Sequence, residues 1–126
     1  MHTILAIAGG GALGAVLRHF LNGLVSSLTG SQFPWGILVC NVMGSLLMGL
    51  LIALFADIWE PPQALRAFLT VGILGGFTTF SSYSMDAVML FERGSYGQAA
   101  LYTAGSVVLS LAALTGGMMF VREISP

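Results

Sequence analysis

Polar side chains gather in the middle of one long apolar segment. Residues 75–84, GGFTTFSSYS, contain two glycines and six side chains with hydroxyl groups. Each glycine weakens a helix by about 1 kcal/mol, and Thr and Ser compete for backbone hydrogen bonds. The stretch therefore predicts a helix break between Gly76 and Thr79, whose free backbone groups would bind an ion or line a watery cavity. The alternative is a kinked helix that stays closed.

Further polar groups lie deep in two other apolar segments. Asn41 is about two turns into the second, and Tyr102, Ser106 and Ser110 recur every four residues in the last. That spacing places the three hydroxyls on one narrow helix face. They either line a path for an anion, together with the Asn41 amide, or form hydrogen bonds between helices and within their own helix.

Two aromatic rings extend this pattern of neutral donors. Phe80 and Tyr83 are three residues apart, so both ring edges, which carry positive charge, can point along one path. Neutral donors suit a small anion that must lose its water without being trapped. Arg18 either reaches the membrane interface or attracts anions at a pore mouth. Asp86 is near the end of its segment, so no carboxylate lies at mid-membrane, where a proton-coupled cation exporter needs one.

The composition indicates an integral membrane protein. Of 126 residues, 56% are hydrophobic and 7% are charged, whereas an average soluble domain has about 25% charged residues. Apolar windows predict four membrane-spanning helices in a single domain 1–126, at about 3–25, 35–56, 67–91 and 98–121. The chain has no lysine, which excludes the basic patch of a nucleic-acid-binding protein. A single cysteine excludes an internal disulfide framework.

The positive charges are evenly divided between the two sides of the membrane. Four spans place both termini on one side, with Arg66 and Arg122, and leave Arg18 and Arg93 on the other. The positive-inside rule then favours neither orientation, which predicts that each chain inserts either way up. Two GxxxG pairs favour close helix packing and a dimer: Gly10 with Gly14, and Gly72 with Gly76.

These motifs resemble those of the CrcB/Fluc fluoride channels over nearly the whole chain. Residues 75–86, GGFTTFSSYSMD, resemble the highly specific signature GGxTTFSTFSxE. Residues 10–18, GGALGAVLR, are similar to the family's first-helix GGxxGAxxR, and residues 34–41, PWGILVCN, to its PxGTLxxN. The stripe in the last segment matches the family's fourth-helix polar track.

The resemblance implies an all-α integral membrane protein of four transmembrane helices, the third broken mid-membrane. It implies an antiparallel dual-topology homodimer in the lipid bilayer, with one structural sodium ion (Na+) at its centre. Backbone carbonyls of Gly75 and Thr78 from both chains would hold this ion. The function implied is passive export of cytoplasmic fluoride through two pores per dimer in a bacterial cytoplasmic (inner) membrane, without catalysis.

Site residues follow from the same reasoning. Along each fluoride pore we expect Asn41, Phe80, Ser81, Tyr83, Ser84, Tyr102, Ser106 and Ser110. At a pore mouth, or in a structural role, we expect Arg18 and Asp86. Two residues depart from the family pattern: Tyr83 stands where phenylalanine is usual, and Ile37 where threonine is usual. The alternatives are a four-helix exporter of the small multidrug-resistance type and a structural membrane subunit that transports nothing.

Overall fold

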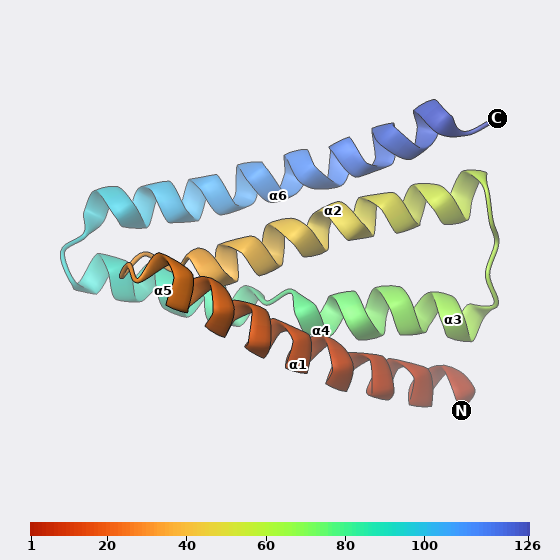
Figure 1. The fold of residues 1–126 in the computed structure, drawn as a ribbon, viewed down its shortest axis with the longest axis horizontal. Coiled ribbons are helices and arrows are strands. Elements are labelled where there is room, and N and C mark those ends of the chain that lie inside the picture. The colour runs from red at the N-terminus through yellow and green to blue at the C-terminus, as the bar shows by residue number, and fades with distance from the viewer.

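Four long helical segments make up the chain (Figure 1). A computed structural model describes residues 1–126. The segments are α1 (His2–Thr29), α2 (Trp35–Asp57), the third segment Gln63–Glu92 and α6 (Tyr96–Ile124), and all four are long and apolar enough to cross a membrane. The prediction of an all-helical protein with four spans is therefore confirmed. Both termini lie at the same end of the bundle.

The third segment is not one regular helix. It begins after the two prolines at residues 61–62 with α3 (Gln63–Ala67), widens into a π-helix, η1 (Phe68–Leu74), and ends its first half with α4 (Gly75–Phe77). Thr78 and Thr79 then adopt extended backbone, with φ of −87° and −152°. Helix α5 (Phe80–Glu92) completes the segment. The helical hydrogen-bond pattern is thus interrupted at two residues.

The interruption lets the third segment change its neighbours. Its first half, from α3 through α4, packs against α1, whereas α5 packs against α6 and makes no contact with α1. Helix α2 lies along α6 and contacts the third segment on both sides of the interruption. Side chains from α2, α5 and α6 can therefore meet beside residues 78–79.

Glycines allow α1 and the third segment to approach at backbone distance. A Cβ atom added at Gly10 would lie 2.6 Å from the Phe68 carbonyl oxygen, and one at Gly14 would overlap the Ile73 carbonyl oxygen. A Cβ at Gly76 would lie 2.5 Å from the Gly11 carbonyl oxygen. The two GxxxG pairs therefore face each other within one chain, where they form the contact between α1 and the third segment.

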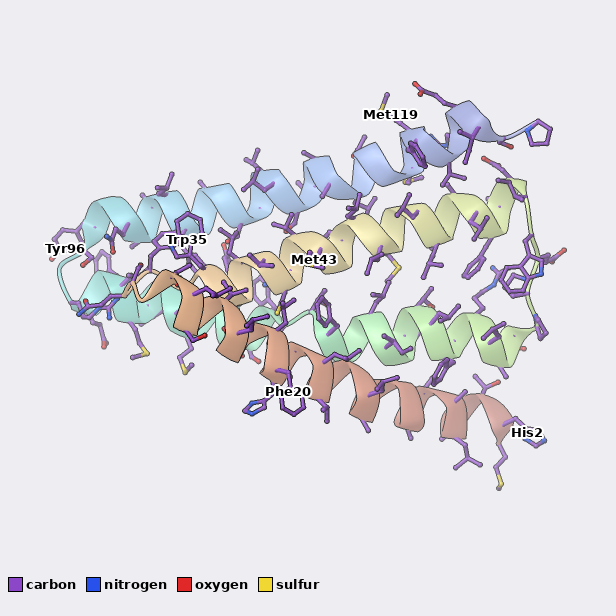
Figure 2. All side chains as sticks on the ribbon, in the orientation of Figure 1. His2, Phe20, Trp35, Met43, Tyr96 and Met119 are labelled. Carbon is purple, nitrogen blue, oxygen red and sulfur yellow. The ribbon has the colours of Figure 1, made fainter.

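The outer surface of the bundle is apolar. Phe20 on α1 and Met119 on α6 project away from the other helices and are 68% and 54% exposed (Figure 2). The buried apolar cluster is small and lies between α2, α5 and α6; it consists of Ile37, Leu38, Tyr83, Leu90, Ala99 and Tyr102. Because lipid is as apolar as these side chains, close backbone packing and hydrogen bonds must hold the helices together.

Gly14→Ala tests the close approach of α1 to η1. Overpacking of this kind destabilises a protein by about 1–3 kcal/mol, so we expect a lower midpoint of thermal unfolding in detergent. Gly9→Ala is the matched control, because a Cβ there would meet no atom within 4 Å. Equal midpoints of thermal unfolding for the two variants would contradict this close contact between α1 and η1.

Candidate functional site

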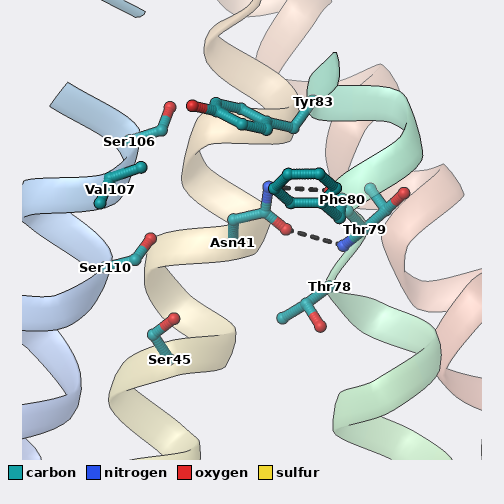
Figure 3. Close-up of a pocket in the computed structure, with 9 residues that line it drawn as sticks. All are labelled: Asn41, Ser45, Thr78, Thr79, Phe80, Tyr83, Ser106, Val107 and Ser110. Atoms are coloured by element: carbon teal, nitrogen blue, oxygen red, sulfur yellow. Dashed lines mark hydrogen bonds between the residues drawn. The ribbon is translucent and has the colours of Figure 1, made fainter. Parts of the chain in front are cut away.

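A cavity of about 280 Å³ lies beside the interrupted helix (Figure 3). Its walls come from α2, from the two extended residues, from α5 and from α6. The lining residues are Asn41, Ser45, Thr78, Thr79, Phe80, Tyr83, Ser106, Val107 and Ser110. Seven of these nine carry a hydroxyl or an amide group, so the cavity gathers polar groups in an otherwise apolar bundle.

Three serine hydroxyls on the cavity wall make no hydrogen bond within the chain. Ser106 is only 4% exposed, and its hydroxyl oxygen is buried without a partner. Ser45 and Ser110 likewise form none of the side-chain hydrogen bonds in the structure. Several other helical hydroxyls donate to the carbonyl one turn earlier at 2.8–2.9 Å, among them those of Thr70, Ser84 and Thr115. The cavity serines therefore keep their protons available for a ligand.

The Asn41 side chain binds both backbone polar groups of Thr79. Its Oδ1 accepts from the Thr79 N–H at 2.8 Å, and its Nδ2 donates to the Thr79 carbonyl at 3.2 Å (Figure 3). Thr79 is 8% exposed, so these groups would otherwise be buried without partners. An amide nitrogen carries two protons, so one N–H of Asn41 remains free at the cavity. Asn41 thus both joins α2 to the third segment and lines the cavity.

Thr79 also starts helix α5. Its side-chain oxygen accepts a hydrogen bond from the Ser82 N–H at 3.1 Å, the usual arrangement at a helix N-cap. The Ser81 hydroxyl lies 3.3 Å from this oxygen, and the Ser84 hydroxyl donates to the Phe80 carbonyl at 2.9 Å. Ser81 and Ser84, which the sequence places along the pore, therefore bond locally and do not line the cavity.

Two tyrosines link α5 and α6 in opposite directions. Tyr83 on α5 donates its hydroxyl proton to the Thr103 carbonyl at 2.8 Å. Tyr102 on α6 donates to Asp86 Oδ2 at 3.2 Å, and it is 1% exposed. The two ring centroids are 5.4 Å apart. Tyr83 lines the cavity, whereas Tyr102 and Asp86 lie outside its lining.

The remaining expected site residues fall in two places. Phe80 lies at the cavity, is 78% exposed and has its ring centroid 5.5 Å from that of Tyr83. Arg18 is half-buried on α1, a helix that contributes nothing to the cavity lining. Sequence reasoning did not assign Ser45 and Thr79 to the site. Ser45 shows one signal, because it lies one turn after Asn41 on the same helix face.

The interruption removes the usual helical donors of carbonyl oxygens at the end of α4, among them those of Gly75 and Thr78. In a continuous helix the Thr79 N–H would donate to Gly75, but here it donates to Asn41. The Ser82 N–H, which would donate to the Thr78 carbonyl in a continuous helix, instead donates to the Thr79 side chain, and Gly75 is exposed. No group of three or more His, Cys, Asp or Glu side chains is placed to hold a metal ion. Backbone oxygens of this kind coordinate sodium ions in broken membrane helices.

Comparisons with known proteins agree on one family. The family model described as "CrcB-like protein, Camphor Resistance (CrcB)" matches residues 5–118. The chain is 53% identical over 121 residues to the fluoride-specific ion channel FluC of Nitrobacter winogradskyi, covering 96% of each chain. It is 48% identical over 122 residues to that of Rhodospirillum centenum, covering 97% of each. It is 46% identical to that of Agrobacterium fabrum over 98% of this chain and 99% of the relative. The matched residues run from α1 into α6, and the chain belongs to the CrcB family.

Proposed function

We propose that the protein is a fluoride channel and that the cavity beside the interrupted helix is part of the fluoride path. Its relatives are named fluoride-specific ion channels, and a channel of this family is not an enzyme. The buried Ser106 hydroxyl, which has no partner within the chain, is the observation that carries the assignment of the path. A buried donor without a partner is unfavourable, and an anion at the cavity supplies the acceptor.

The chemistry of the wall suits a small anion that must enter and leave. The hydroxyls of Ser45, Ser106 and Ser110 and the free N–H of Asn41 replace water molecules around the ion one after another. The Phe80 ring edge adds a weak positive field. None of these groups is charged, so the ion is not held too tightly to leave. A negative-inside membrane potential drives the anion outward with about 2.3 kcal/mol per 100 mV.

A second copy of the chain completes the path. Phe80, at the cavity rim, is 78% exposed, and a polar wall open to hydrocarbon is costly. The even division of the arginines allows the second copy to insert the opposite way up. We therefore propose an antiparallel homodimer with two paths, each broken third helix lying at mid-membrane, in a bacterial cytoplasmic membrane.

A sodium ion at the centre of this dimer fits the free backbone oxygens. The carbonyls of Gly75 and Thr78 lose their usual helical donors at the interruption, and two chains together would supply four such oxygens. The ion would neutralise their partial charges and hold the two broken segments together, and it would not be transported. Neutral carbonyls suit a hard monovalent cation better than the softer transition metals.

The two alternatives are less well supported. A small multidrug exporter exchanges protons through a buried carboxylate, and no carboxylate lines the cavity. A structural subunit that transports nothing has no need for unpaired hydroxyls inside its membrane-spanning bundle. The named relatives are moreover channels.

Fluoride efflux from liposomes tests the function. Purified protein in liposomes loaded with potassium fluoride is expected to release fluoride when valinomycin lets potassium leave. Liposomes loaded with potassium chloride should release no more chloride than protein-free ones. The assignment is wrong if fluoride stays inside, or if chloride leaves equally fast.

Labelling of single cysteines tests the dual topology. In a Cys40→Ala background, Glu123→Cys and Glu92→Cys place a thiol at opposite ends of the bundle, and loss of Glu hardly affects orientation. A membrane-impermeant maleimide applied to spheroplasts should label about half of each variant, and the rest after lysis. Complete labelling of one variant with none of the other would establish a single orientation.

A further inference from the structure

We propose that the Tyr83 side chain closes one end of the fluoride path and that its hydrogen bond to α6 is a latch. This inference rests on the function proposed above. It concerns the position where the chain departs from the family pattern by carrying a hydroxyl on the expected aromatic ring.

Tyr83 lies across the cavity rather than along its wall. It starts on α5, and its hydroxyl reaches toward α6, close to Ser106 in the view of Figure 3. There the hydroxyl donates to the Thr103 carbonyl at 2.8 Å. The side chain is 8% exposed and its ring centroid is 5.5 Å from that of Phe80. The ring is thus attached at both ends, by its own backbone and by the hydrogen bond.

A second cavity lies beyond this ring, toward the end of α5. It has a volume of about 70 Å³ and is lined by Gln32, Pro34, Asp86, Met89, Leu90 and Arg93. The two cavities share no residue. Tyr102, which contacts the Tyr83 ring, donates its hydroxyl proton to Asp86 in the second cavity. The two tyrosines thus connect the first cavity, which Tyr83 lines, to Asp86 in the second.

Tyr83 is the more easily moved of the two tyrosines. Tyr102 is 1% exposed, is bound to Asp86, and packs edge-to-face against Phe33 at 5.5 Å. Tyr83 has a single latch bond, to a neutral carbonyl. Because Tyr83 is the less buried of the two and has no other side-chain hydrogen bond, its ring is the one we expect to move. Rotation of the Tyr83 ring then joins the two cavities.

The hydrogen bond to Thr103 also determines whether the Tyr83 hydroxyl can bind fluoride. A tyrosine hydroxyl has one proton, and this proton is donated to Thr103. The oxygen therefore offers only lone pairs to the path, which repel an anion. Tyr83 is therefore a positioning residue that limits the rate of fluoride transport, and its hydroxyl does not bind fluoride.

Tyr83→Phe tests the latch in the liposome assay, because it keeps the ring and removes the bond. We expect the maximal fluoride efflux rate to rise about two- to tenfold, the factor that corresponds to one neutral hydrogen bond. The half-saturating fluoride concentration should not change. Tyr96→Phe is the matched control: Tyr96 is 62% exposed and lies outside both cavities, so neither quantity should change.

Other outcomes overturn the latch. A lower rate together with a higher half-saturating concentration would show that the hydroxyl binds fluoride, and an unchanged rate would show that the bond does not limit transport. Elution as a single peak on size exclusion verifies folding. If Tyr83→Phe does not fold, Tyr83→Leu replaces it, with the same rise in rate expected. Failure of the unmutated protein to release fluoride would instead overturn the proposed function, and the latch with it.

Discussion

The two hydrogen bonds between the Asn41 side chain and the Thr79 backbone are the constraint on which the rest of the structure depends. They replace the partners that a continuous helix would supply to Thr79, whose N–H and carbonyl are buried. An unpaired buried amide costs several kcal/mol in an apolar surrounding. The interruption therefore persists because a side chain on α2 matches one donor and one acceptor. It frees the Gly75 carbonyl and redirects α5 toward α6.

The two halves of the third segment are held by different means. Glycines hold the first half against α1, because they let backbone meet backbone. The second half is held by hydrogen bonds from Tyr83 to α6 and from Tyr102 to α5. Neither attachment needs a large apolar core, which would add little stability in lipid. The polar cavity lies where these two attachments and α2 leave space, beside the one interruption of the helix.

Much of this arrangement can be predicted from the sequence. The length of the apolar segments predicts the membrane spans, and the four-residue spacing of Tyr102, Ser106 and Ser110 predicts that they share one face of α6. Contacts between residues far apart in the sequence cannot be predicted in this way. The hydrogen-bond partner of Asn41 is 38 residues away. The partner of Tyr83 is a backbone carbonyl, which no side-chain pattern indicates. Extended residues 78–79 also reset the helical phase. Ser81 and Ser84, close to Phe80 in sequence, bond to the Thr79 side chain and the Phe80 carbonyl instead of facing the cavity.

Ser106→Ala is the most direct measurement of the central claim, that unpaired hydroxyls in the cavity serve the anion. A hydrogen bond to a charged group contributes about 1.5–3 kcal/mol, so we expect fluoride efflux to fall about tenfold or more. The thermal midpoint should stay equal or rise, because the variant removes a buried hydroxyl that has no partner. Unchanged fluoride efflux would contradict this claim. So would a loss of efflux accompanied by a lower thermal midpoint, because destabilisation of the protein would then explain the loss.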